Sequence, residues 1–276
     1  MHISVIITAA GSSRRFGEAD KLAADFGGRP LLLRSIEPFT KRDEVHAIIV
    51  AGPPDDLDSF RDRYGAQLGF LGGTIVEGGR LERWETVRNA LGAVPPETTH
   101  VAIHDGARPL VDETLIDRVI EAGRTNVAVI PGLPVRDTLK RCGEEIFEAA
   151  VRDATVDAIL GLGDEAADAL LEEDTAPSPG HQVPARRVGE TVPRERLFRV
   201  QTPQLFDVDL LRRAYAQEDL TGATDDAMLV ERLGEPVVMV EGDERNLKVT
   251  TPGDLEIAKA LAGLRGEAGK PAHKRF

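Results

Sequence analysis

Three positively charged side chains lie close together near the N-terminus, just after a short apolar run. Ile3–Ile7 leads into Thr8–Gly17, a loop of small residues that carries Arg14 and Arg15, and Lys21 follows. Small residues let backbone N–H groups approach an anion closely, and the cations add positive charge. We predict a site for a phosphate-rich ligand such as a nucleoside triphosphate, with Arg15 and Lys21 as its main cations.

A second polar group, His104–Pro109, follows another apolar run. The carboxylate of Asp105 is a hard oxygen ligand, suited to holding Mg²⁺ on a triphosphate. The guanidinium of Arg108 can pair with a substrate phosphate through two parallel hydrogen bonds. The alternative is a surface ion pair in the turn that leads into a helix, and these residues alone leave both interpretations open.

A glycine pair, Gly78 and Gly79, follows a third apolar run. Without a Cβ atom, the backbone there can approach a base or a ribose closely. Thr86 lies one helical turn beyond Arg83, so both side chains can face one pocket. An ordinary loop and helix start is the alternative.

Several familiar site types are absent from the sequence. It contains neither of the common glycine-rich nucleotide fingerprints, GxGxxG and GxxxxGK[ST], which disfavours a nicotinamide dehydrogenase, and no GxSxG hydrolase elbow. Its six histidines lack zinc-ligand spacing. The single cysteine, Cys142, cannot form an intrachain disulfide, and we expect it to be buried or half-buried.

The composition indicates a globular, acidic protein. The formal net charge is −13, which argues against general nucleic-acid binding, because such proteins usually carry a basic field. No stretch approaches the ~20 apolar residues of a membrane span. The N-terminus shows no secretory signal, and a reducing compartment fits one cysteine, so we expect a cytoplasmic protein without membrane partners.

Short apolar runs alternate with helix-like segments over the first half of the chain. This rhythm predicts an α/β fold, a doubly wound, mostly parallel sheet with helices on both faces. Ligands of such sheets bind beyond the carboxyl ends of the strands, where the first loop and His104–Pro109 both lie. The expected strands are 2–8, 46–51, 74–76, 100–104 and 126–130, and the expected helices are 30–40, 55–64, 83–93 and 112–124.

The rhythm stops after Val135. We predict one domain over residues 1–264, with residues 136–200 forming an expanded β-arm and residues 265–276 a flexible tail. Within the arm, residues 143–190 are irregular, with an acidic helix possible at 155–173. After the arm we expect helices at 208–217, 225–233 and 252–264, and strands at 237–240 and 248–250.

The motifs together resemble the 2-C-methyl-D-erythritol 4-phosphate cytidylyltransferase family. The resemblance runs in order from residue 3 to about residue 261 and leaves out residues 143–190 and the tail. Lys21 is followed by Leu22-Ala23, where the family more often has Gln and an aromatic residue, and the loop Gly79–Arg83 is one residue longer than usual. The matching segments are Ala9–Arg15 with Lys21, Gly78-Gly79, Arg83–Val87, His104–Pro109, Val135–Lys140, Gln201–Phe206, Thr224–Ala227 and Asn246–Thr250.

The resemblance implies a glycosyltransferase-A-like nucleotidyltransferase domain, a homodimer joined through the β-arm, and the substrates CTP and a sugar-alcohol phosphate. Arg15 and Lys21 would be catalytic, and Asp105 would hold Mg²⁺. The implied nucleotide-binding residues are Ala9, Ala10, Gly11, Gly79, Thr86 and Gly106, and the implied substrate-binding residues are Asp105, Arg108, Thr138, Arg194, Thr202 and Lys248.

The implied chemistry needs no protein nucleophile, because the acceptor phosphate can itself attack the α-phosphorus of CTP. The protein's task is to align two polyanions and to neutralise charge that builds up. Two other functions stay open at this point. One is a cytidylyltransferase for another polyol phosphate, such as ribitol 5-phosphate, and the other is a non-catalytic nucleotide-binding regulator.

Overall fold

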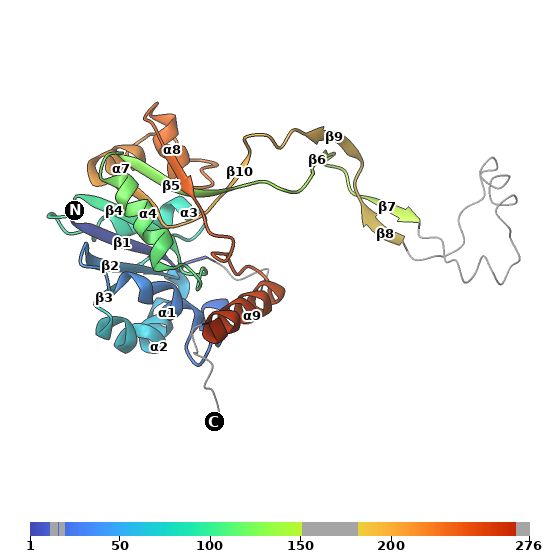
Figure 1. The fold of residues 1–276 in the computed structure, drawn as a ribbon. Helices are drawn as coiled ribbons and strands as arrows, with labels where there is room; N and C mark the ends of the chain where they lie inside the picture. The colour runs from blue at the N-terminus through green and yellow to red at the C-terminus, as the bar shows by residue number, and fades with distance from the viewer. Residues whose placement is uncertain (12–15, 17–19, 151–181, 269–276) are drawn as a thin grey trace, which may run out of the picture. The chain divides into compact units, whose positions relative to one another are not determined.

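The computed structural model describes residues 1–11, 16, 20–150 and 182–268. Contacts between residues divide the chain into two compact units, residues 1–134 with 198–276 and residues 135–197. The first unit holds an eight-stranded sheet (Figure 1). Its strands, in spatial order, are β10 (Phe198–Val200), β5 (Ala128–Pro134), β11 (Gln204–Asp207), β4 (His100–Asp105), β1 (Ile3–Thr8), β2 (Val45–Gly52) and β3 (Gly73–Glu77), and β12 (Val238–Glu241) also pairs with β5.

The sheet is mostly parallel, as predicted. β1 pairs in parallel with β2 and β4, β2 with β3, and β12 with β5. β11 is the exception within the sheet, because it runs antiparallel between β4 and β5. β10 is antiparallel to β5 at the edge. No strand is predicted at residues 204–207 from the sequence, so the insertion of β11 in the main sheet is a finding of the structure.

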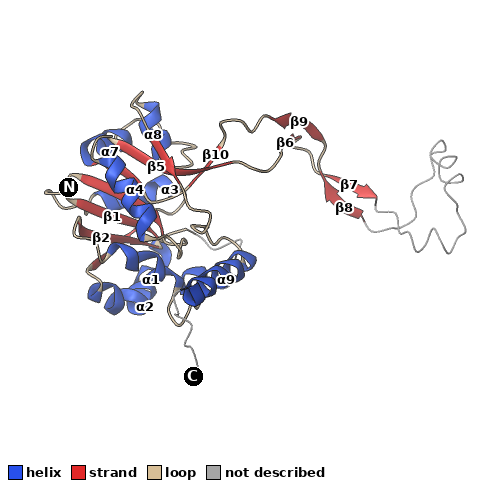
Figure 2. Ribbon diagram, viewed as in Figure 1, coloured by secondary structure: helices blue, strands red, loops and turns tan. Residues whose placement is uncertain are grey.

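Helices cover both faces of the sheet (Figure 2). Alternating side chains of β1 explain this arrangement, because Val5 and Ile7 enter one hydrophobic cluster and Ile6 enters the other. The first cluster includes residues of α1 (Leu31–Ile36), α2 (Leu57–Phe70), α4 (Glu113–Gly123) and α9 (Pro252–Ala268). The second includes residues of α3 (Arg83–Leu91), α7 (Val208–Tyr215) and α8 (Asp226–Arg232).

The second unit, residues 135–197, contains two antiparallel pairs of strands. β6 (Leu139–Cys142) pairs with β9 (Val188–Val192), and β7 (Phe147–Ala150) pairs with β8 (Gln182–Ala185). Strands are thus present within the predicted β-arm at 136–200, but β10 at the end of that range belongs to the main sheet. The helix predicted at 155–173 lies outside the described residues.

Three predicted details are wrong. Cys142 is exposed rather than buried, because among the described residues its strand, β6, pairs only with β9 in a two-stranded sheet. Residues 248–250 form no strand, although Val249 is buried and its N–H donates to Ala107 O at 2.8 Å. The last helix, α9, ends at Ala268, four residues beyond the predicted end. No helix among the described residues is long and apolar enough to cross a membrane.

Candidate active site at the carboxyl ends of β1 and β4

The carboxyl ends of two central strands bring the first loop and the motif His104–Pro109 together. Thr8 and Asp105 are register partners at the ends of β1 and β4. Gly106 N donates to Thr8 O at 3.1 Å, and Thr8 Oγ1 donates to Asp105 Oδ1 at 3.4 Å. The site therefore lies where parallel sheets bind ligands, as predicted from the strand pattern.

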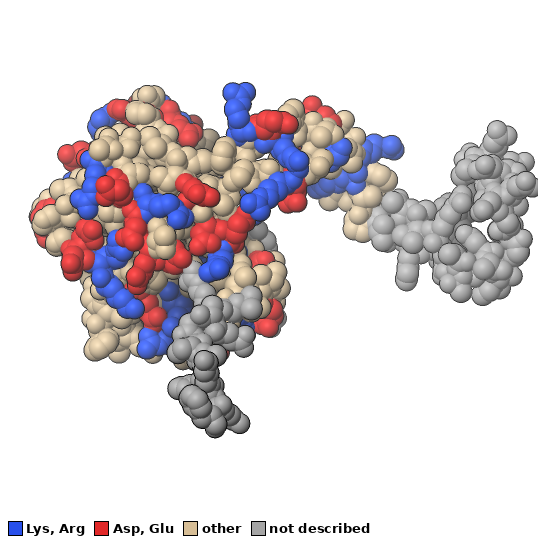
Figure 3. Space-filling model, viewed as in Figure 1, with Lys and Arg blue, Asp and Glu red and all other residues tan. Residues whose placement is uncertain are grey.

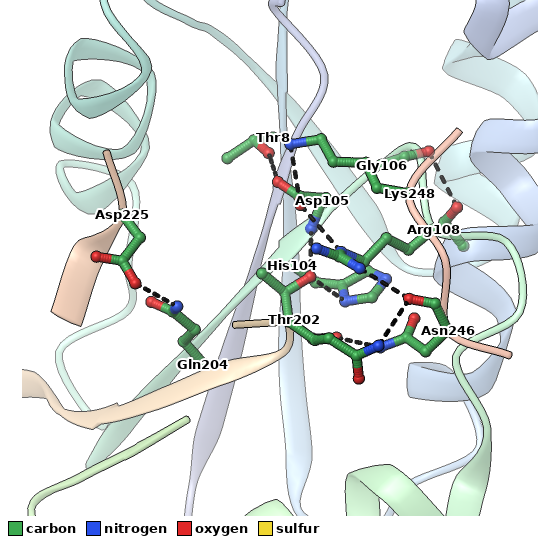
Figure 4. A network of polar contacts seen from close by, with 12 residues as sticks. Thr8, His104, Asp105, Gly106, Arg108, Thr202, Gln204, Asp225, Asn246 and Lys248 are labelled. Carbon is green, nitrogen blue, oxygen red and sulfur yellow. Dashed lines mark hydrogen bonds and ion pairs between the residues drawn. The ribbon is translucent and has the colours of Figure 1, made fainter. Parts of the chain in front are cut away.

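Asp105 is the centre of this site (Figure 4). Its Oδ2 accepts a hydrogen bond from Arg108 Nε at 3.1 Å and lies 3.1 Å from Lys248 Nζ. Lys248 comes from a segment more than a hundred residues further along the chain. Two of the predicted substrate-binding cations thus contact the predicted metal ligand directly.

The charges around Asp105 decide its protonation. Burial by itself raises the pKa of the Asp105 carboxyl. The positive charges of Lys248, Arg108 and Arg83 outweigh burial and hold this pKa well below its usual value. Asp105 is therefore an anion at neutral pH.

The two cations differ in exposure. The Arg108 side chain is 10% exposed, and its Nη1 donates to Asn246 O at 2.7 Å. The Lys248 side chain is 39% exposed. Lys248 is therefore the more accessible of the two to a phosphate, and Arg108 is fixed mainly by groups of the protein.

Thr202 contacts Asp105 through the backbone. Its hydroxyl accepts a hydrogen bond from Asp105 N at 3.1 Å and lies 3.0 Å from His104 Nδ1. Burial lowers the pKa of His104 to about 3, so the imidazole is neutral and its Nδ1 shares one hydrogen bond with the Thr202 hydroxyl. Thr202, predicted to bind substrate, here fixes the end of β4.

Buried amides connect the segment that carries Thr202 to the segment that carries Lys248. Asn246 Nδ2 donates to Thr202 O at 2.8 Å. Gln201 Nε2 donates to Asp243 O at 2.8 Å, and its Oε1 accepts from Asp243 N at 3.0 Å. These bonds explain why the two segments occur together among the motifs, because each holds the other in place.

The glycine pair packs against the first loop. A Cβ atom added to Gly78 would lie 2.5 Å from Ala10 Cβ, and one added to Gly79 would lie 2.7 Å from Thr86 N. Gly79 N donates to Thr86 Oγ1 at 3.0 Å. Four predicted nucleotide-binding residues thus lie in adjoining segments: Ala9 and Ala10 in the first loop, Gly79 in the glycine loop and Thr86 in the first turns of α3.

Three further predicted site residues, Lys21, Gly11 and Gly106, lie in different local structures. Lys21 begins a short 3₁₀ turn, η2 (Lys21–Ala23), whose N-terminal cap is Asp20. Gly11 is exposed. Gly106 uses its N–H for Thr8 O and its carbonyl for Ser35 Oγ at 2.9 Å, so it serves the packing of the strand ends.

The remaining predicted residues belong to other parts of the chain. Arg15 and its neighbour Arg14 lie outside the described residues. Thr138 and Arg194 are exposed and belong to the second unit, where Arg194 Nη1 donates to the carbonyl of Arg136.

Asp226 was not singled out by the sequence analysis as a site residue. It is fully buried, and its Oδ2 lies 2.7 Å from Nη2 of Arg83. The same arginine has its Nε 3.9 Å from Asp105 Oδ1. The available signal was the pair of adjacent aspartates within Thr224–Ala227.

The described residues contain no group of three or more histidine, cysteine, aspartate or glutamate side chains that could hold a metal ion. The carboxylate that the strand ends offer is that of Asp105. That donor fits Mg²⁺, which is commonly held by one or two carboxylates together with substrate phosphates and water.

Comparison with known proteins gives one consistent result. The profile of the 2-C-methyl-D-erythritol 4-phosphate cytidylyltransferase (IspD) family matches residues 3–159 and 172–263. A protein of that name from Frankia casuarinae is 38% identical over 262 residues, which cover 94% of this chain and 80% of that protein. One from Rhodopirellula baltica is 35% identical, with 94% of each chain covered.

A bifunctional relative and a solved structure extend the comparison. The bifunctional IspD/IspF enzyme of Solidesulfovibrio magneticus is 37% identical, and this chain spans 58% of its length. The crystal structure of 2-C-methyl-D-erythritol 4-phosphate cytidylyltransferase from Thermus thermophilus is 32% identical, with a TM-score of 0.63, and the match covers 95% of this chain and 100% of that one.

Proposed function

The chain belongs to the 2-C-methyl-D-erythritol 4-phosphate cytidylyltransferase family, and on that basis we propose that it transfers the cytidylyl group of CTP to 2-C-methyl-D-erythritol 4-phosphate. The products are 4-diphosphocytidyl-2-C-methyl-D-erythritol and pyrophosphate, in the non-mevalonate route of isoprenoid biosynthesis. The main structural support is the convergence of Asp105, Arg108 and Lys248 beside the first loop.

The reaction joins two polyanions, and the residues of the site suit that task. An oxygen of the acceptor phosphate attacks the α-phosphorus, a new P–O bond forms, and the bond to the departing pyrophosphate breaks. In this proposal Lys248 receives the acceptor phosphate, and Arg15 of the first loop and Lys21 of η2 neutralise the triphosphate. Alignment and charge neutralisation supply the catalysis, so no protein nucleophile is needed.

Asp105 is the residue we propose to hold Mg²⁺. Its Oδ1 lies 3.4 Å from Thr8 Oγ1 and 3.9 Å from Arg83 Nε, whereas its Oδ2 has two cations at 3.1 Å. Oδ1 is therefore the more open oxygen. A bound Mg²⁺ would neutralise negative charge on the triphosphate.

We also propose a homodimer formed through residues 135–197. Support comes from the apolar side chains that this unit exposes, because Ile146 is 58% exposed and Val188 is 60% exposed. Thr138 and Arg194 of the same unit would then contact the acceptor, as the family resemblance implies. Exposed apolar side chains gathered on one segment commonly mark a protein–protein contact.

The function is tested by pyrophosphate release from CTP, UTP, ATP and GTP, each with methylerythritol phosphate or ribitol 5-phosphate and Mg²⁺. We expect release from CTP with methylerythritol phosphate to exceed every other pairing. Faster release with ribitol 5-phosphate would reassign the acceptor, and no release with any pairing would contradict the enzyme assignment.

A further inference from the structure

A buried ion pair joins the start of α3 to α8, close to Asp105 but outside the set of site residues assigned above. Arg83 is the first residue of α3, and its side chain is 25% exposed. Its Nη2 lies 2.7 Å from Oδ2 of Asp226, whose side chain is completely buried. A charge of this kind is costly to bury unless it is paired, so Asp226 and Arg83 depend on each other.

Asp226 is itself held from its other side. Tyr215 donates its hydroxyl to Asp226 Oδ1 at 2.5 Å. Burial, together with the charge of Asp226, raises the pKa of Tyr215 well above its usual value, so the phenol keeps its proton and remains a donor. The neighbouring Asp225 caps α8 by accepting from Met228 N at 3.1 Å and from Gln204 Nε2 at 2.9 Å. The N-terminus of α8 is therefore fixed to α7 and to β11.

Arg83 connects Asp226 to the candidate active site, because its guanidinium lies between Asp226 and Asp105. Its Nε lies 3.9 Å from Asp105 Oδ1, within ion-pair range but beyond a hydrogen bond. Burial works against the charge of Arg83, but the charges of Asp226 and Asp105 raise its pKa further above the usual value, so it remains a cation. The two oxygens of Asp105 thus have different surroundings, with short cation contacts at Oδ2 and a more distant cation at Oδ1.

We propose that Asp226 is a positioning residue for the cytidylyl transfer, acting through Arg83 on the carboxylate of Asp105. Asp226 anchors the guanidinium at 2.7 Å and so keeps it at ion-pair range from Asp105 Oδ1, instead of in a direct bond that would occupy this oxygen. The orientation of the Asp105 carboxylate then depends on a residue that contacts no reacting group. This inference rests on the proposed function for its kinetic test.

The kinetic test compares Asp226→Asn, Arg83→Gln and the double variant R83Q/D226N with the wild type. A misplaced catalytic group can lower turnover roughly a hundredfold, so we expect D226N and R83Q each to lose roughly tenfold or more in kcat. Because Asp226 acts through Arg83, the double variant should be no slower than R83Q. Losses that multiply in the double variant, or D226N with normal kcat, would overturn the proposal.

Two controls separate positioning from a general loss of structure. Tyr215→Phe removes a hydrogen bond to Asp226 but keeps the Asp226–Arg83 ion pair, so its kcat should stay within about threefold of the wild type. If D226N alone does not fold, R83Q/D226N removes both buried charges, and its kcat is compared with that of R83Q. Equal rates support the proposal and a slower double variant contradicts it.

Crystal structures of the wild type and D226N supply a readout that does not depend on turnover. The expected change is that the Arg83 guanidinium leaves position 226 and bonds Asp105 Oδ1 directly. An unmoved Arg83 would overturn the proposal, even in an active enzyme. If no nucleotide and acceptor pairing reacts with the wild type, the proposed function fails, while the positions of Arg83 and Asp105 still test the coupling.

Discussion

At the residue scale, the candidate site is built around one carboxylate, Asp105, which has positively charged side chains near it from different parts of the chain. Asp105 contacts Arg108 from its own loop and Lys248 from a distant segment. In the proposed function, the acceptor phosphate would compete with Asp105 for these cations, chiefly for the more exposed Lys248. A polyanionic substrate that binds these cations would change the charges around Asp105. Substrate binding would therefore be coupled to the pKa of the Asp105 carboxyl.

Lys21→Ala and Arg15→Ala test the triphosphate-binding role of the first loop. In the proposed function each substitution removes a cation that neutralises charge in the transition state, so we expect turnover to fall by roughly a hundredfold or more. Steady-state pyrophosphate release measures the effect, and circular dichroism checks the fold. Arg14→Ala is the matched control and should lose far less. A near-normal rate for K21A or R15A would remove that residue from the mechanism.

His104 makes the stability of the protein depend on pH. Burial lowers its folded-state pKa to about 3 from 6.5, so the unfolded chain binds the proton more readily between these values. The contribution of neutral His104 to the free energy of unfolding should therefore be fully present above about pH 6.5. As the pH falls from there toward about 3, the free energy of unfolding should decrease by about 1.4 kcal/mol per pH unit. His104→Asn removes this titrating group, so the free energy of unfolding should depend less steeply on pH. Urea unfolding at about pH 7 and about pH 5 measures both proteins, and parallel slopes would contradict the assignment.

At the scale of elements, side-chain hydrogen bonds hold the backbone of the glycine loop, residues 78–82. One carboxylate oxygen of Glu85 accepts hydrogen bonds from the amides of Arg80, Leu81 and Glu82 at 2.9–3.1 Å. These hydrogen bonds lower the pKa of Glu85, so it remains an anion. The loop is therefore shaped before any nucleotide binds, which reduces the conformational entropy lost on binding.

Gly79→Ala tests this constraint. The added Cβ would lie 2.3 Å from Glu85 Cβ, so the loop must shift, and we expect the KM for CTP to rise. A displacement near 1 Å can cost roughly a hundredfold in a positioned site, and we expect roughly tenfold or more here. Gly69→Ala is the control, because nothing lies within 4 Å of its added Cβ. An unchanged KM in G79A would show that the loop does not contact the nucleotide.

The sequence predicts where the helices and strands lie better than it predicts which strands pair with each other. Hydrophobic runs located the strands β1 to β5 and the helices between them, because each run is long enough to bury one element. The position of β11 between β4 and β5 was not predictable, since an extended segment carries no signal of its partner strand. Residues 248–250 were misassigned for a related reason, because a buried Val249 does not reveal the absence of a neighbouring ladder.

The same contrast holds for the candidate site, where local sequence patterns are informative and long-range contacts are not predictable. Residue types at strand ends are enough to predict Asp105, Arg108 and the first loop as candidate site residues. The buried partners that hold them, such as Asp226 and Asn246, were not identified as site residues, because their roles depend on contacts across more than a hundred residues of sequence. Thr202 was recognised from its motif, but its hydrogen bonds to β4 could not be derived from spacing.

At the scale of the whole molecule, acidic and basic residues are interspersed on the face shown in Figure 3. The formal net charge of the chain is −13, although its proposed substrates are anions. The cations around Asp105 therefore act locally, against the long-range repulsion expected from the net charge. Substrate binding should accordingly weaken less with added salt than it does in proteins with a large basic surface.

The proposed dimer is tested by Val188→Asp in β9. A charge in an apolar contact is costly to desolvate, so we expect the dimer to weaken by roughly tenfold or more. Phe70→Asp is the matched control, because Phe70 is 90% exposed but lies at the end of α2, outside the 135–197 unit. Sedimentation velocity over a concentration series measures both. A wild-type monomer, or an equal effect of both variants, would contradict dimerisation through residues 135–197.

The central claim is that this chain forms a diphosphate bond between CMP and the phosphate of methylerythritol phosphate. Phosphorus NMR of the reaction with CTP and Mg²⁺ tests it most directly, because the product carries a mutually coupled pair of phosphorus nuclei, both esterified, that neither substrate contains. We predict that these two signals grow together with free pyrophosphate. Formation of CMP and pyrophosphate without the coupled pair, or an unchanged spectrum, would contradict the account.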